Sequence, residues 1–361
     1  MVPSSPHNWK ELPMDLSLAV RRVSLRLTET VRSSRGEIDS VDTCMVAIAH
    51  GGVVAYGEGT PIEYDGVTAD DVARAVEADG PALLGQDLSD PEAALDRVER
   101  WDAPAGARMA LDGALHDWIG KAAGRPTWSV LGTPRTLGPT VYTIGIANPD
   151  EAASAVRNAP PVGAFKVKVG GPGDIDALEA IRRMTPLPVR IDANEAWDLD
   201  TARALTPRLR ALGIQLIEQP FPRTEIDDYH RYRELPDRLP IVLDEGCTDV
   251  ASVQAARQHS DGIVVKLCKA GGVRGARRVM EAARRAGLTV LLSCMCESEL
   301  AISQAALLAP LADHIDLDGH LYLREPPFHG LGLEDGRITL GDAPGLGVVP
   351  GTLSTSDLDW R

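Results

Sequence analysis

Short apolar runs separated by helix-sized stretches dominate the chain after Pro139, and several of the runs end in a charged residue. Strands that alternate with helices in this way predict a parallel sheet. We expect eight strands, at 141–147, 164–169, Val189–Asp192, 215–218, 241–244, Gly262–Lys266, Thr289–Ser293 and 314–318. Helices are expected between them, among others at Ile175–Met184, 200–212, Val250–His259 and 273–286.

Eight β/α units in succession predict an α/β fold of the (β/α)8-barrel type over residues 139–329, with an irregular final unit. The main alternative is an open, doubly wound sheet, which binds dinucleotides through a glycine-rich turn after its first strand. No such glycine fingerprint follows the first strand of this chain. The pattern therefore favours the barrel.

The first part of the chain has a different order, with strands before helices. Apolar β-type runs cover 16–30, 41–50 and Val53–Gly59, and Gly51-Gly52 is typical of a hairpin turn. Helices are expected at 69–79, after Asp90-Pro91, and at 107–122. This order predicts an α+β domain over residues 1–138. The polar, Gly/Pro-rich segment 330–361 is expected to pack back on that domain.

Charge and composition exclude several classes of protein. The 361 residues carry a net charge of −15, which argues against a general nucleic-acid binder. No apolar run is long enough to span a bilayer, and the polar amino end lacks the apolar core of a signal peptide. Five scattered cysteines fit reduced thiols better than a disulfide framework. We expect a cytoplasmic enzyme that acts on a small molecule and forms a homo-oligomer.

Acidic side chains close three successive strands of the predicted barrel. Asp192, Glu218 and Asp244 end the third, fourth and fifth strands, and active sites of such barrels lie at these strand ends. One acid alone would be read as the cap of the next helix, but three in successive units predict a site for one Mg²⁺ per subunit. Asn194 and Glu245 follow two of these acids, and we expect them to support the ligands by hydrogen bonds.

Lysines end the second and sixth strands. Lys166 and Lys168 are two residues apart and point to one face, which is the barrel interior unless the strand shows a basic outer surface. Burial and a neighbouring positive charge lower a lysine's pKa, and a lysine whose pKa is about 7–8 acts as a base near neutral pH. We predict Lys168 as the base and Lys166 as its modulator. Lys266, on the opposite wall, is predicted as the second acid/base, in preference to Lys269.

Further polar residues are expected at the mouth. Asp316 and Asp318 share a face at the eighth strand, where they form either a site for a substrate ammonium or a solvated acidic loop. After the seventh strand, Cys296 and Glu297 are expected to line the pocket. A zinc site at Cys294 and Cys296 is the weaker alternative, because no second thiol pair joins them.

Together these motifs resemble the enolase superfamily in its muconate-lactonizing-enzyme-like subgroup. The resemblance rests on Lys166-x-Lys168, on the three acids, on Lys266-x-x-Lys269-x-Gly271-Gly272, and on 109–131, which is similar to the end of the family's capping domain. It implies a modified, enolase-like barrel with an N-terminal capping domain. It also implies Mg²⁺, an enediolate intermediate and lysines as general acid and base.

Within the subgroup, Asp316-x-Asp318 resembles the dipeptide epimerases, in which this pair binds the α-ammonium of the dipeptide. The implied activity is Mg²⁺-dependent inversion at Cα by 1,1-proton transfer. Side-chain selection is expected from a capping-domain loop near 28–38, with Arg32 and Arg35, and from 294–298. Other reactions of the superfamily remain open, namely N-acylamino acid racemase, o-succinylbenzoate synthase and cycloisomerase. A non-catalytic metal-binding protein is the remote alternative.

Overall fold

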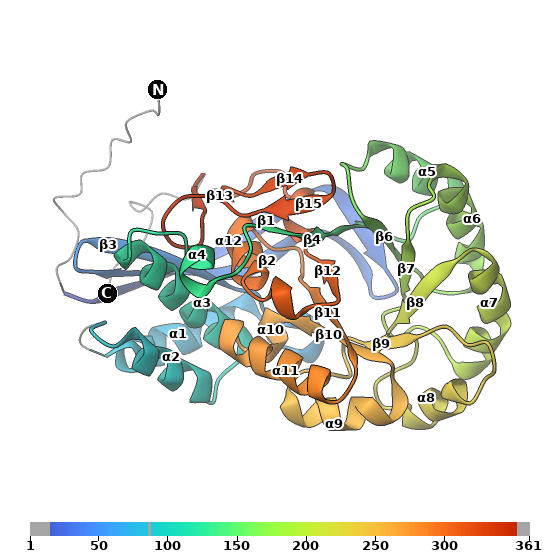
Figure 1. The fold of residues 1–361 in the computed structure, drawn as a ribbon, viewed down its shortest axis with the longest axis horizontal. Helices are drawn as coiled ribbons and strands as arrows, with labels where there is room; N and C mark the ends of the chain where they lie inside the picture. The colour runs from blue at the N-terminus through green and yellow to red at the C-terminus, as the bar shows by residue number, and fades with distance from the viewer. Residues whose placement is uncertain (1–14, 86–87, 352–361) are drawn as a thin grey trace.

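The computed structural model describes residues 15–85 and 88–351, which form a capping domain packed against a barrel (Figure 1). The capping domain begins with an antiparallel sheet in the order β1-β2-β3. Its elements are β1 Ser17–Ser33, β2 Gly36–His50, β3 Val53–Gly59, α1 Ala69–Leu84, α2 Pro91–Arg100, α3 Ala105–Ala122 and α4 Thr127–Leu131. These follow the predicted order of strands and then helices.

Side-chain caps explain where two helices of this domain, α1 and α2, begin. The Thr68 side chain accepts a hydrogen bond from the amide of Asp71 and completes a capping box at the start of α1. Asp90 accepts from the amide of Ala93, and Pro91 occupies the first turn of α2. One expectation needs correction: 28–38 is not a loop, because β1 and β2 continue through it. Only Ser34 and Arg35, which form the turn between the two strands, lie outside them.

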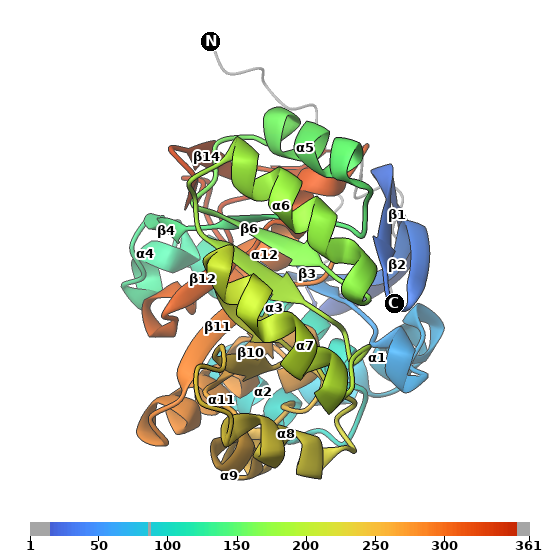
Figure 2. The ribbon, with the colours of Figure 1, turned by 90° about the vertical axis from the view of Figure 1, so that its right-hand side faces the viewer.

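Eight parallel strands form the barrel, in the order β12-β11-β10-β9-β8-β7-β6-β5, which confirms the predicted fold class. They are β5 Val141–Ile144, β6 Ala164–Lys168, β7 Val189–Asp192, β8 Ile214–Glu218, β9 Ile241–Leu243, β10 Gly262–Lys266, β11 Thr289–Ser293 and β12 His314–Asp316. Helices surround the strands (Figure 2): α5 Pro149–Asn158, α6 Ile175–Met184, α7 Leu199–Ala211, α8 Ile226–Arg233, α9 Val250–His259, α10 Leu267–Ala270, α11 Val273–Arg285 and α12 Glu299–Ala306.

The final unit is irregular, as predicted, because β12 leads into a 3-10 helix, Gly319–Tyr322. Side chains connect β5 to this last unit across the seam. The Asp318 carboxylate accepts from the Thr143 amide at 2.7 Å, and the Leu317 amide donates to Thr140 Oγ1 at 3.1 Å. The barrel is therefore nearly closed, and one of the acids at its mouth takes part in the closure.

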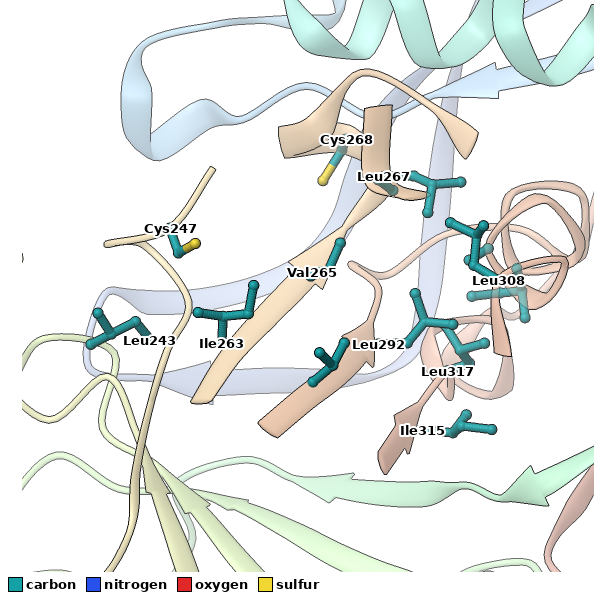
Figure 3. Packing of buried hydrophobic residues seen from close by; sticks show 14 of the residues in the cluster. Leu243, Cys247, Ile263, Val265, Leu267, Cys268, Leu292, Leu308, Ile315 and Leu317 are labelled. Atoms are coloured by element: carbon teal, nitrogen blue, oxygen red, sulfur yellow. The ribbon is translucent and has the colours of Figure 1, made fainter. Parts of the chain in front are cut away.

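Strand alternation separates two apolar layers. Leu216, Val242, Val264 and Leu291 form a small cluster of their own inside the barrel. Ile263 and Val265 of β10 belong instead to the large cluster between strands and helices, together with Leu292 of β11 (Figure 3). Because successive side chains point to opposite faces, Lys266 shares the inner face with Val264.

The segment after the barrel adds two small sheets. In one, β4 Thr136–Pro139 pairs with β15 Arg337–Thr339, which pairs with β14 Gly332–Glu334; in the other, β13 Phe328–His329 pairs with β16 Val349–Pro350. The Leu346 amide donates to Asp117 on α3 at 2.7 Å, and Trp128 Nε1 donates to the Gly341 carbonyl at 2.9 Å. These bonds link the segment to the capping domain. The remainder of the segment expected to return, 352–361, lies outside the described residues.

None of the helices in the described ranges combines the length and the apolar composition that crossing a lipid bilayer requires.

Close packing of β3 on α3 predicts a stability effect. A methyl group added at Gly57 would clash with backbone atoms of Ala110 and Ala114, which cannot move without displacing the helix. We expect Gly57→Ala to lower the free energy of unfolding by about 2 kcal/mol or more. Gly173→Ala is the matched control, since its methyl group would meet open space. Urea unfolding followed by circular dichroism measures both, and equal midpoints would contradict the prediction.

Candidate active site

Three buried carboxylates lie together at the carboxyl ends of neighbouring strands. Asp192 and Glu218 end β7 and β8, and Asp244 directly follows β9. Their exposed fractions are 0%, 2% and 1%. Buried charges are costly unless they are paired, so the partners of these acids decide what the site can do.

One lysine ammonium connects acids from several strands. Lys166 Nζ on β6 lies 2.9 Å from Glu218, 3.1 Å from Asp192 and 3.0 Å from Asp316. Burial lowers the pKa of Lys166, but the charges of Asp316, Glu218 and Asp192 outweigh it and hold the pKa well above its ordinary value. In this arrangement Lys166 acts as the counter-ion of the acid cluster.

Lys168, two residues further along β6, lies on the same face nearer the mouth. Its Nζ donates to Asp192 Oδ2 at 2.7 Å and to Asn194 Oδ1 at 2.9 Å. Its side chain is 18% exposed, against 7% for Lys166. Lys168 is therefore the more accessible of the two amines.

Two lysines contact Asp244 from the side of the barrel that lies across from β6. Lys266 Nζ at the end of β10 donates to Asp244 Oδ2 at 2.7 Å. Lys269 Nζ bonds to Asp244 Oδ1 and to the carbonyls of Cys247 and Val264, at 3.1 and 3.2 Å. Every proton of the Lys269 ammonium thus has a protein acceptor, whereas the only oxygen acceptor of Lys266 among the described residues is Asp244. The structure gives Lys269 a supporting position and leaves Lys266 beside the cluster.

The donor atoms of the cluster suit a hard divalent cation. All three side chains offer carboxylate oxygens, the ligands that Mg²⁺ prefers. The positively charged Lys166 ammonium lies between two of them, Glu218 and Asp192. Within the described ranges, no three acidic, cysteine or histidine side chains stand in a ligating arrangement. Each of the three carboxylates is paired with a lysine ammonium.

The acids of the eighth strand lie in the same region. Asp316 Oδ2 accepts from Lys166 Nζ and from Ser293 Oγ, each at 3.0 Å. Asp318 Oδ2 accepts from Tyr322 Oη at 2.7 Å, in addition to its bond at the barrel seam. Burial, and then the charge of Asp316, raise the pKa of Asp318 to about 6. These acids are therefore buried side chains in the mouth rather than parts of a solvated loop.

The predicted pocket residues after β11 separate into two positions. Cys296 is partly buried beside the site, and the charges of Asp318 and Lys168 both affect the pKa of its thiol. Glu297 is buried, and the charge that raises its pKa is that of Glu58 on β3 of the capping domain. Burial, and then the charge of Glu58, raise the pKa of Glu297 to about 7. Glu297 thus faces the capping domain rather than the acid cluster.

The two arginines of the β1–β2 hairpin also lie in different places. Arg32 pairs with Glu37 at 2.9 Å, and its side chain is 47% exposed. Arg35 reaches the barrel, where it pairs with Glu195 at 3.1 Å and with the buried Glu245. The tip of the hairpin therefore brings Arg35, and not Arg32, to the residues around the acid cluster.

Sequence reasoning missed two residues of this region. Arg190 lies two positions before Asp192 on β7 and bonds to His314 Nδ1 inside the barrel at 3.1 Å; strand alternation could have found it. Tyr64 comes from the capping domain, in a 3-10 helix at Glu63–Asp65. Its hydroxyl is buried and has no hydrogen-bond partner among the described residues. Nothing in the sequence near Tyr64 indicates this position.

Family models match almost all of the described chain. Residues 16–132 match the mandelate racemase / muconate lactonizing enzyme N-terminal domain, and residues 149–352 match the enolase C-terminal domain-like family.

The chain belongs to the enolase superfamily.

Several similar proteins are named as epimerases. An L-Ala-D/L-amino acid epimerase from Maribacter sp. is 32% identical over 339 residues, covering 92% of this chain and 99% of that protein. An L-Ala-D/L-Glu epimerase from Bacteroides thetaiotaomicron is 34% identical over 313 residues, covering 84% and 80%. A structure of a dipeptide epimerase from Methylococcus capsulatus, complexed with Mg and the dipeptide L-Arg-D-Lys, has 32% identity and a TM-score of 0.84. It covers 93% of this chain and 100% of that chain.

The buried carboxyl of Glu297 predicts a pH-dependent stability in this enolase-superfamily protein. Its pKa is about 7 in the folded state, against an ordinary value of 4.5 for the unfolded chain. The folded state therefore holds the proton more tightly, and this contribution to stability is present below pH 4.5 and lost as the pH rises through 7. Glu297→Gln should remove a pH-dependent loss of about 3 kcal/mol.

Urea unfolding between pH 4.5 and 8.5 measures this difference between wild type and variant. The exposed Glu334→Gln is the control and should follow the wild type at every pH. Parallel curves for Glu297→Gln and wild type would show that this carboxyl titrates normally.

Proposed function

We propose that this protein is a Mg²⁺-dependent dipeptide epimerase, an isomerase that inverts one Cα centre. One observation carries the proposal: Lys168 and Lys266 reach the acid cluster from opposite walls of the barrel. β6 and β10 are four strands apart in the eight-stranded order, and each lysine contacts a different acid of the cluster. Amines on both sides of one carbon allow a proton to leave from one face and return on the other.

The lysines supply the proton transfers of this reaction. In its neutral form Lys168 accepts the Cα proton of one epimer, while the Lys266 ammonium returns a proton to the opposite face. The roles exchange for the reverse direction. Asp192, Glu218 and Asp244 would hold Mg²⁺, which when bound offsets these carboxylates and the negative charge that develops on the substrate carboxylate.

Asp316 and Asp318 would bind the α-ammonium of the dipeptide. Among the described residues, the hydrogen bonds of both carboxylates go through Oδ2, which leaves Oδ1 of each to accept from a substrate. Charge-assisted bonds of this kind are strong in a buried site. They would orient the substrate by its amino end, and Asp192, Glu218 and Asp244 would hold the cation that its carboxylate end requires.

Side-chain preference would depend on residues around the mouth. The relatives named above differ in their substrates, from Ala-Glu to Arg-Lys dipeptides. In this chain Cys296 lies beside the site, and Arg32 and Glu297 remain candidates for indirect effects on selection. Free thiols at all five cysteines agree with the proposed cytoplasmic location. The homo-oligomeric state stays a prediction, which light scattering after size-exclusion chromatography tests.

A screen of mixed dipeptides in D₂O with Mg²⁺, followed by NMR, tests the proposed reaction. Deuterium entering the Cα of one residue, together with the appearance of the other epimer, identifies the substrate. Lys168→Ala and Lys266→Ala should each lower the rate of epimerisation by about 10²- to 10⁴-fold. Full activity in either variant would mean that the acid/base pair is assigned incorrectly.

The proposed ammonium site predicts a selective change in KM. Asp316→Asn should raise KM for the dipeptide by about tenfold or more, because a charged bond in a buried site is weakened. The N-acetylated dipeptide, which has no ammonium, is the matched control substrate. Its KM should be high in the wild type and nearly the same in the variant.

If Asp316→Asn changes both KM values equally, the carboxylate does not recognise the ammonium. A wild type that prefers the acetylated compound would instead favour an N-acylamino acid racemase.

A further inference from the structure

The tip of the β1–β2 hairpin contacts the turn that follows β7. This hairpin extends from the capping domain to the barrel (Figure 1). Ser34 Oγ donates to the carbonyl oxygens of Ala193 and Asn194, at 3.2 and 3.3 Å. Arg35 pairs with Glu195 in the same turn. The capping domain therefore bonds directly to the segment that carries Asn194.

A continuous chain of hydrogen bonds runs from this tip to the proposed base. Arg35 Nη2 donates to Glu245 Oε1, which also accepts from Asn194 Nδ2 at 3.3 Å. The other end of the same amide, Asn194 Oδ1, accepts from Lys168 Nζ at 2.9 Å. Because the amide uses both ends, its orientation is determined by the carboxylate on one side and the amine on the other.

The backbone of the turn needs these contacts. Asn194 and Glu195 have φ values of 44° and 68°, in the left-handed region that non-glycine residues seldom adopt. Such conformations persist where surrounding bonds hold them, and they cluster at functional sites. Within the barrel, the Glu195 amide donates to the Gln219 carbonyl at 2.8 Å and the Asn194 amide donates to Asp192 Oδ1 at 3.0 Å. The hairpin adds the bonds of Ser34 and Arg35 to the same turn.

Arg35 is committed to these protein partners. The Glu245 side chain is fully buried, so its charge requires a neighbouring cation, and Arg35 provides it. The guanidinium also lies over the ring of Tyr64, 4.4 Å from the centroid. Two carboxylates and an aromatic ring already contact the guanidinium. We therefore do not expect Arg35 to bind an acidic side chain of the substrate.

We propose that Arg35 is a positioning residue for Lys168. It acts through the carboxylate and the amide that stand between them, and it couples the seating of the capping domain to the placement of the base. The inference rests on the proposed function, since Lys168 must be the base for one epimer. Lys266 bonds to Asp244 and contacts Met295 Sδ, and neither of these two residues bonds to a hairpin side chain among the described residues. We therefore expect the larger effect on the side of the reaction that Lys168 serves.

The test compares Cα–H exchange in the two epimers of one dipeptide. In D₂O with Mg²⁺, Lys168→Ala identifies the epimer whose exchange depends on that lysine. Arg35→Met should slow exchange of the same epimer by about tenfold or more, because a small misplacement of a catalytic group is costly. Exchange of the other epimer should change by about twofold at most. Arg35→Lys, which keeps the charge, should restore part of the loss.

Arg223→Met is the matched control. Arg223 also bridges the domains, through Asp65 at 2.8 Å and Glu195 at 3.7 Å, but its ion pairs in the described part of the chain do not include Glu245. It should leave the ratio of the two exchange rates unchanged. Equal slowing of both epimers in Arg35→Met, or no slowing, would overturn the proposal.

A second measurement does not require the reaction. Lysine acylation by an N-hydroxysuccinimide ester, quantified by peptide mass spectrometry, should modify Lys168 faster in Arg35→Met than in wild type, with Lys266 unchanged. Unchanged labelling of Lys168 would overturn the positioning role. A wild type that exchanges no dipeptide at all would instead contradict the proposed function, and the labelling result would still decide whether Arg35 positions Lys168.

Discussion

Pairing of buried carboxylates with lysine ammoniums is the interaction on which the barrel mouth depends. Asp192, Glu218 and Asp244 are almost inaccessible, and their like charges would repel one another in a medium of low polarity. Lys166 lies between two of them and Lys269 is bonded to the third. Loss of one partner from such a group leaves an uncompensated buried charge. The cluster is therefore stable only as a complete set.

The barrel geometry explains why this cluster is polar while the layer below it is apolar. Along β10, Val264 packs with Leu216, Val242 and Leu291 inside the barrel, and Lys266 follows on the same face. A (β/α)8 barrel fills its interior with branched apolar side chains and presents its strand ends to the ligand. The change from apolar to charged occurs within two residues of a single strand, so small shifts in register would remove the site.

The capping domain is joined to this mouth by polar contacts as well as by apolar packing. Asp112 on α3 accepts from the amide of Val273 at 2.7 Å, and Ser298 donates to the buried Glu58. At the hairpin tip, Arg35 neutralises Glu245 next to the acid cluster. Because these partners come from different domains, correct seating of the capping domain and correct charge balance at the mouth depend on each other.

The fold and most residues of the candidate site could be predicted from the sequence alone. Alternating apolar runs and helix-sized stretches predicted the eight strands, and the polar residues at their ends indicated which side chains would meet, because parallel strands share one edge. The family and the fold class are confirmed. The roles of Lys168, Lys266 and the acids stay predictions.

Only the tertiary structure decided the contacts between segments that are distant in the sequence. The separate positions of Arg32 and Arg35, the place of Glu297 at the domain interface and the buried hydroxyl of Tyr64 depend on how the capping domain seats on the barrel. Local periodicity describes only neighbours within one element, so it carries no information on such contacts.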